Sequence, residues 1–193
     1  MHRHPAKVLR PGDVRLLLRH VSSHRHPERS EIIILLSFKA GLRACEIAGL
    51  TWEMVLGPDG KVSRQLTVAN SIAKKGSGRQ IPTHPKLRIA LDRLHKLAGC
   101  PLGGPVIQSQ RGGPMSADGI VNWFTSLYRA LGLVGCSSHS GRRTFITQSA
   151  RVLARTGGSL RDIQELAGHR ALTTTERYIM GDRASQRRLI ALI

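Results

Sequence analysis

The sequence predicts a mainly α-helical fold that carries a small three-stranded antiparallel β-sheet. Most of the chain has apolar residues at helical spacing between turn residues, as in 85–99, where Leu87, Leu91 and Leu94 share one face. Residues 52–83 instead combine short β-branched runs with glycine-rich turns. A chain of 193 residues can bury about 70% of its unfolded surface. One domain can therefore be stable here without a disulfide or a structural metal.

Several helices are predicted in order along the chain. The first follows Pro11-Gly-Asp13, with Asp13 as its N-cap. The second, at about 30–40, is apolar nearly all round, which places it at the centre of the core. Gly41 ends it, and a third helix covers about 43–50. Later helices are expected at about 85–99, 116–131, 141–155 and 160–167, followed by a short one that starts at Leu172 and carries Tyr178.

The sheet is expected within residues 52–83. Gly57-Pro-Asp-Gly60 is a turn, Leu66-Thr-Val68 has strand composition, and Arg79-Gln-Ile-Pro-Thr83 returns as a strand. Between the last two lies a glycine-rich hairpin tip that presents Lys74 and Lys75 on a loop.

The charge of the chain indicates a polyanionic partner. Lys and Arg number 30 against 12 Asp and Glu, a net charge of +18, and the basic residues recur along the whole length. Nucleic acid fits better than a membrane surface, because no strongly amphipathic basic helix stands apart. Charge alone leaves open a generic basic protein of the ribosomal kind.

Cysteine, histidine and hydropathy patterns favour a cytoplasmic protein without metal. The three cysteines, at positions 45, 100 and 136, form no CxxC pair and are expected to be reduced. The histidines within residues 1–30 could bind metal or belong to a solvated basic segment; no carboxylates at a matching spacing accompany them, so no metal site is expected. No apolar run approaches the ~20 residues of a membrane span, and the first twenty residues have no signal-peptide core.

Residues 138–178 contain the side chains best suited to phosphate chemistry. A guanidinium offers a charged fork of donors that matches two phosphate oxygens. An imidazole can move a proton near neutral pH, and a phenol becomes a nucleophile when cations or a base activate it. These groups are His139, Arg142, His169 and Tyr178.

Their spacing resembles a known family. His139-Ser-Gly-Arg142, then Gly168-His169, with Tyr178 nine residues later, resemble the second half of the active site of the tyrosine recombinases, the phage-integrase-type site-specific recombinases. Upstream, Gly41-Leu-Arg43-Ala-Cys-Glu46 looks like the first arginine motif of that family. Lys74-Lys-Gly-Ser-Gly-Arg-Gln-Ile-Pro82 looks like its β-hairpin lysine motif. The resemblance covers about 8–180 and implies the tyrosine recombinase catalytic-domain fold.

The resemblance also implies a role for each matched residue. Tyr178 would attack DNA to form a 3′-phosphotyrosyl bond, and Lys74 would protonate the leaving 5′-oxygen. The phosphate would be held by Arg43, Arg142, His139 and His169, with Glu46 supporting Arg43. Aligning the closing Ile-Pro favours Lys74 over Lys75, although a one-residue slip in a hairpin would exchange them. Lys75, Arg79 and Arg143 are expected to contact DNA; Arg143 stands where the family commonly has histidine. No cofactor is expected, because side chains supply the cations.

The expected partners follow from the same resemblance. They are double-stranded DNA at recombination sites, further copies of the chain, as a tetramer in the synaptic complex, and accessory DNA-bending proteins. Residues 1–193 would form a single catalytic domain without a separate N-terminal core-binding domain, either as a small recombinase or as a fragment. The tail, 181–193, would pack on a neighbouring protomer.

Two other functions stay open at this point. A type IB topoisomerase shares the phosphotyrosyl chemistry but relaxes supercoils as a monomer. A DNA-binding regulator on the same scaffold would need no catalysis.

Overall fold

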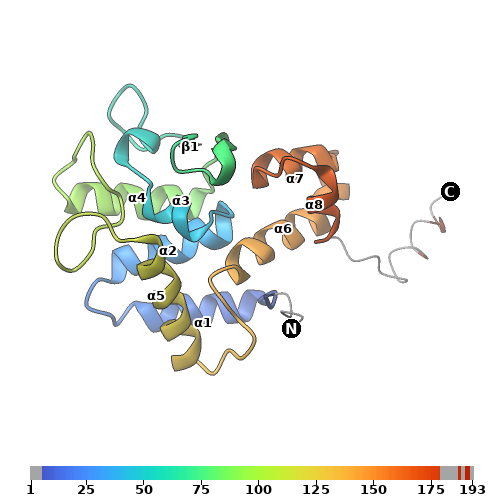
Figure 1. Ribbon diagram of the computed structural model, residues 1–193, viewed down its shortest axis with the longest axis horizontal. Coiled ribbons are helices and arrows are strands. Elements are labelled where there is room, and N and C mark those ends of the chain that lie inside the picture. Colours follow the sequence, from blue (N-terminus) through green and yellow to red (C-terminus); the bar gives the residue numbers. More distant parts are fainter. Residues whose placement is uncertain (1–5, 179–186, 188–189, 192–193) are drawn as a thin grey trace.

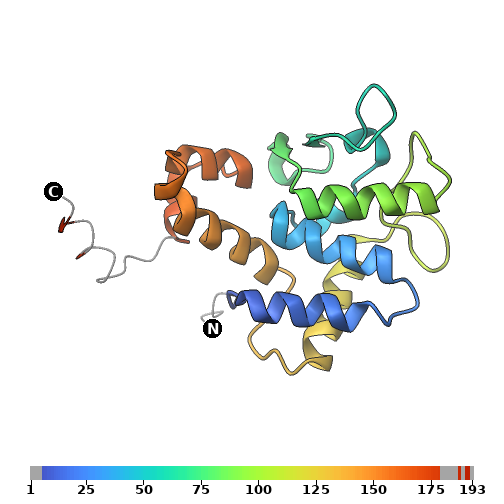
Figure 2. The ribbon, with the colours of Figure 1, turned by 180° about the vertical axis from the view of Figure 1, so that it is seen from behind.

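Helix α2 (Pro27–Lys39) lies at the centre of the computed structural model, which describes residues 6–178, 187, 190 and 191 (Figure 1). Every residue from Ile32 to Phe38 is buried. Helices α1 (Pro11–Val21) and α4 (Pro85–Leu97) cover it on two sides, and Figure 2 shows α2 between them. The predicted central helix is therefore confirmed, because a segment that is apolar all round needs neighbours all round.

The start of α1 differs from the prediction. The helix begins at Pro11 with Arg10 as N-cap, and the Asp13 carboxylate accepts the Arg10 backbone N–H at 2.8 Å. Asp13 is thus in the first turn and is not the N-cap, which corrects the prediction. Proline suits the first helical position, because its fixed φ is already helical and its missing N–H has no partner there anyway.

Helices α3 (Ala44–Ala48) and α5 (Ala117–Ala130) pack against each other beside α2. Ser116 caps α5 as predicted, since its hydroxyl accepts the Gly119 N–H at 3.0 Å. The buried face of α5 includes Phe124 and Tyr128, whose rings stack at 5.7 Å.

The sheet has two strands in the part of the chain that the structure describes, so the predicted three-stranded sheet is wrong. Strands β1 (Gln65–Val68) and β2 (Arg79–Pro82) pair antiparallel, and the 3-10 helix η2 (Lys74–Gly76) lies in their connection. Ahead of β1, within the segment 52–83 that was expected to hold the sheet, Trp52–Met54 form the 3-10 helix η1, and Leu56 and Val62 make an isolated bridge. The Trp52 carbonyl accepts the N–H groups of Val55 and Leu56, so these amides cannot extend a ladder.

The last helices form a separate lobe. Helices α6 (Ser140–Val152), α7 (Leu160–Ala167) and α8 (Leu172–Glu176), with the 3-10 helix η3 (Leu153–Arg155), lie to one side of the remaining structure in Figures 1 and 2. We call residues 140–178 the C-terminal lobe and residues 6–139 the body. The lobe has its own small apolar cluster around Ile146, Ile163 and Ala167. Apart from residues 187, 190 and 191, the predicted tail 181–193 is outside the described residues.

None of the described helices is both long and apolar enough to cross a membrane.

Candidate active site

A pocket of about 930 Å³ lies where the C-terminal lobe meets the body. Arg43 and Lys74 reach it from the body, His139 from the junction before α6, and Arg142, His169 and Tyr178 from the lobe. All six side chains for which the sequence predicts a catalytic role therefore line one cavity, although they come from segments far apart in the chain.

Arg43 is held at the pocket by Glu46. It is the N-cap of α3, its backbone N–H donates to Glu46 Oε2 at 2.9 Å, and its Nη1 donates to Glu46 Oε1 at 2.7 Å. Glu46 is fully buried. Burial raises the pKa of Glu46, but hydrogen bonds and charge from Arg79 and Arg43 outweigh this effect and keep the pKa below its ordinary value. Glu46 is therefore a carboxylate that fixes the Arg43 guanidinium.

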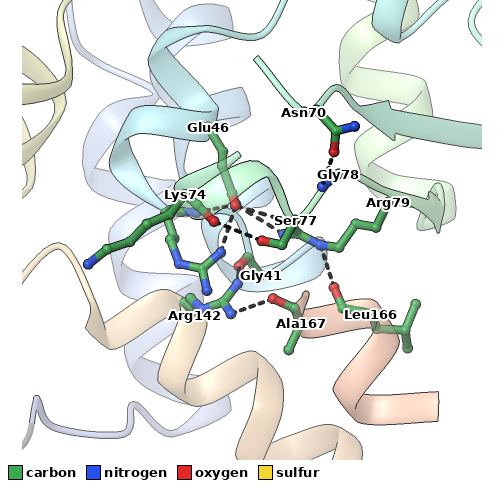
Figure 3. Close-up of polar contacts among 11 residues, drawn as sticks. Gly41, Glu46, Asn70, Lys74, Ser77, Gly78, Arg79, Arg142, Leu166 and Ala167 are labelled. Atoms are coloured by element: carbon green, nitrogen blue, oxygen red, sulfur yellow. Dashed lines mark hydrogen bonds and ion pairs between the residues drawn. The ribbon is translucent and has the colours of Figure 1, made fainter. Parts of the chain in front are cut away.

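Arg142 lines the pocket and is buried, with 4% of its surface exposed. Its Nη1 donates to the Gly41 carbonyl at 2.7 Å and its Nη2 donates to the Ala167 carbonyl, so it joins body and lobe (Figure 3). Burial, with the nearby charge of Arg43, lowers the pKa of Arg142 to about 9. The guanidinium stays charged at pH 7, and its remaining N–H groups, which bond to none of the described residues, can donate to an anion.

The two histidines are neutral at pH 7. Burial lowers the pKa of His169 to about 4, assisted by the charges of Arg142 and Arg43. Partial loss of water and the charges of Arg142 and Lys74 also lower the pKa of His139. His169 Nδ1 lies 2.9 Å from the hydroxyl of Thr175, which is fully buried and sets the ring orientation. Sequence reasoning missed Thr175, since nothing distinguishes it within Thr-Thr-Thr.

Tyr178 lies in the turn that follows α8, where its N–H donates to the Thr175 carbonyl at 3.0 Å. The expectation that the helix itself carries Tyr178 is thus off by two residues. Its ring stacks on His169 with centroids 5.7 Å apart and an interplanar angle of 22°. The guanidinium carbon of Arg143 is 5.6 Å from the Tyr178 ring centroid, a cation–π distance.

The model of the phage integrase family matches residues 7–184. This chain belongs to the phage integrase family. Tyrosine recombinase XerC of Brucella suis biovar 1 (strain 1330) is 32% identical over 155 residues, which are 78% of this chain and 45% of that protein. XerC of Methylobacterium sp. (strain 4-46) is 34% identical over 161 residues, 81% of this chain and 47% of that protein. The chain spans about half the length of these relatives.

Solved structures show the tyrosine recombinase catalytic fold. The crystal structure of XerA recombinase matches with a TM-score of 0.74 and 21% identity, over 98% of this chain and 65% of that chain. A lambda integrase tetramer bound to a Holliday junction matches with a TM-score of 0.67 and 19% identity, over 93% and 50% of the two chains. These matches confirm the expected catalytic-domain fold, apart from the third strand of the sheet.

The three residues predicted to contact DNA lie in environments that differ from one another. Arg143 lies beside the Tyr178 ring. The side chain of Lys75 is outside the described part of the structure. Arg79 is turned inward, with its side chain 6% exposed and bonded to Glu46. The DNA contact of Arg79 stays a prediction, and its guanidinium is bonded to protein groups in this structure. The exposed side chain of Lys74, in contrast, lines the pocket as the lysine motif requires.

Among the described residues, no group of three His, Cys, Asp or Glu side chains could hold a metal ion.

Proposed function

We propose that this chain is the catalytic unit of a site-specific DNA recombinase, which cleaves and rejoins DNA strands through a 3′-phosphotyrosyl intermediate. The observation that carries the proposal is that the six predicted residues, which are three cations, two neutral imidazoles and one phenol, all line one pocket. The XerC relatives, at 32% and 34% identity, support the same reaction class.

The proposed reaction starts with the attack of the Tyr178 hydroxyl oxygen on a scissile phosphorus. The bond from phosphorus to the 5′-oxygen breaks, and Lys74 gives that oxygen a proton. The phenolic proton leaves with the help of the neutral imidazoles of His139 and His169. One phosphodiester replaces another, so the bond energy is kept and the 5′-hydroxyl of a partner strand can reverse the step without ATP.

The arginines stabilise the transition state in this scheme. Arg43 and Arg142 bind the non-bridging oxygens, on which negative charge develops. Both are held by protein groups before DNA arrives, Arg43 by Glu46 and Arg142 by two backbone carbonyls. Little reorganisation is then needed during the reaction, which is the condition for effective electrostatic stabilisation.

We further propose double-stranded DNA and additional copies of this chain as partners. Each protomer offers one tyrosine in the pocket, Tyr178, and exchange between two duplexes cuts four strands, so a tetramer is the matching assembly. The lambda integrase tetramer on a Holliday junction is an example in a protein of the same fold. Accessory DNA-bending proteins and action at the nucleoid in the cytoplasm belong to the same proposal, as does the assignment of one catalytic domain.

The test is covalent capture of DNA. The chain is incubated in EDTA with nicked candidate attachment-site DNA, and protein–DNA adducts are counted for the wild type and for Tyr178→Phe. An adduct that is lost in Tyr178→Phe supports the proposal, and exchange between two sites then separates a recombinase from a topoisomerase, which only relaxes supercoils. Binding without any adduct on several sites would favour a regulator.

A further inference from the structure

Arg79 occupies a position that the proposed reaction does not use. It is the first residue of β2, opposite Val68, yet its side chain runs inward and is 6% exposed. Its Nη1 and Nη2 donate to Glu46 Oε1 and Oε2, both at 3.0 Å, and its Nε donates to the Leu166 carbonyl at 2.8 Å (Figure 3). All three nitrogens are therefore bonded to protein groups.

Glu46 connects Arg79 to Arg43, because its carboxylate accepts hydrogen bonds from both arginines. The same two carboxylate oxygens that receive Arg79 also receive the backbone and side-chain N–H groups of Arg43. A fully buried carboxylate with two guanidinium partners is fixed in position, whereas loss of one partner leaves a buried charge incompletely bonded. The orientation of Arg43 at the pocket thus depends on Arg79 through Glu46.

The hydrogen bond from Arg79 to the Leu166 carbonyl connects Arg79 to the C-terminal lobe. Leu166 and Ala167 supply the last carbonyls of α7, which have no acceptor role inside the helix, and they receive Arg79 and Arg142 respectively. Directly afterwards come Gly168 and His169. A Cβ added at Gly168 would lie 2.9 Å from Arg79 Nη1, so the guanidinium packs closely on the turn that aims His169.

From these contacts we infer that Arg79 is a positioning residue that locks the body and the C-terminal lobe in the geometry of the active pocket. It orients Arg43 through Glu46 and holds the end of α7 that precedes His169. A forked guanidinium can serve both ends at once, which a lysine ammonium cannot do. The role deepens the proposed recombinase function and rests on it.

Single-turnover cleavage tests the inference. After Tyr178-dependent adduct formation is established for the wild type, the rate at saturating DNA is measured for Arg79→Met and Arg79→Lys, at temperatures where melting curves show both to be folded. We expect both rates to fall about 10- to 100-fold, as for misplaced catalytic groups, with affinity and its salt dependence unchanged. Arg88→Met, which removes an exposed arginine on α4, is the matched control and should cleave like the wild type.

Three outcomes would overturn the inference while leaving the proposed function intact. One is a wild-type cleavage rate in Arg79→Met. Another is full rescue by Arg79→Lys, which would mean that charge alone suffices. The third is a salt slope that falls by about 0.9 with the rate at saturation unchanged, which would make Arg79 a DNA contact.

Hydrogen exchange supplies a readout that needs no activity. In Arg79→Met, the amides of segments 41–50 and 160–170 should both exchange faster than in the wild type and Arg88→Met, because one side chain holds both segments. Unchanged exchange in the two segments would contradict the inference. This measurement also keeps the test of Arg79 separate from that of the recombinase function.

Discussion

At the scale of single residues, the pocket is a place where positive charge is concentrated and partly desolvated. Arg43, Arg79 and Arg142 surround one carboxylate, that of Glu46, so the cluster keeps an excess of positive charge for a phosphate. Burial, assisted by the charges of Arg142 and Arg43, lowers the pKa of both neighbouring imidazoles, His139 and His169, and keeps them neutral. Arginine binds the anion and histidine moves the proton because their proton affinities differ so widely in this environment.

His169 should remain neutral far below the usual range of histidine. NMR titration of its ring, identified by loss of the signal in His169→Gln, should give a pKa near 4 in the free protein. The unfolded chain binds this proton below about pH 6.5, so between pH 6.5 and 4 the unfolded state takes up more protons and stability falls as the pH falls. His169→Gln should reduce that loss. A His169 pKa of about 6.5 would show that burial and the nearby arginines do not lower it.

Lys74 can be tested as the general acid by changing the leaving group. Lys74→Ala should slow cleavage of ordinary DNA by about 10²- to 10⁴-fold. DNA with sulfur in place of the bridging 5′-oxygen should restore the rate, because a thiolate leaves without a proton. Arg43→Gln is the control that sulfur should not rescue. Rescue of Lys75→Ala in place of Lys74→Ala would assign the role to Lys75.

Arg143 is expected to hold the Tyr178 ring in place through its cation–π contact. Arg143→Met removes a cation–π contact with Tyr178 worth about 0.5–1 kcal/mol, so adduct formation at saturating DNA should fall about 2- to 5-fold. The salt dependence of DNA binding should not change. A slope lower by about 0.9 would instead support the DNA contact that the sequence predicts for Arg143.

At the scale of elements, the end of α7 is the critical junction. The lobe that carries His169 and Tyr178 has only a small apolar cluster. Its attachment therefore depends on the contact of α6 with α2 and on two arginines that bond to the last carbonyls of α7. Gly168 ends α7 in the left-handed conformation, at φ 61°, and its lack of a Cβ leaves room for Arg79.

Two glycine substitutions distinguish the effect of backbone strain from the effect of packing between Gly168 and Arg79. Gly157 and Gly168 have φ values of 65° and 61°, so alanine at either should cost about 1–2 kcal/mol of stability. Only Gly168→Ala also places a Cβ against Arg79, whereas a Cβ at Gly157 meets nothing within 4 Å. Melting temperatures should therefore fall in both variants, and cleavage by the folded protein only in Gly168→Ala. Equal cleavage rates would show that the packing on Arg79 is unimportant.

At the scale of the whole molecule, the net charge of +18 should govern DNA affinity. If about six phosphates are contacted, affinity should fall roughly 10³-fold between 50 and 200 mM salt. Fluorescence anisotropy of labelled duplex DNA measures this dependence, and Tyr178→Phe should give the same slope as the wild type. EDTA should change neither binding nor cleavage. A slope below about 3 would mean that most of the charge lies away from DNA.

The sequence by itself determined the set of pocket residues and the centre of the fold. Ordered motifs predicted the six pocket residues, and the apolar segment 30–40 predicted the central helix, because residue type and local spacing depend only on the chain. Three features depended on the tertiary structure. No third strand forms among the described residues, Arg143 contacts the Tyr178 ring, and the Arg79 side chain points inward. The partners of Arg79 are 33 and 87 residues away in the chain. Local spacing cannot report such distant contacts, and they determine which way a charged side chain at the start of a strand points.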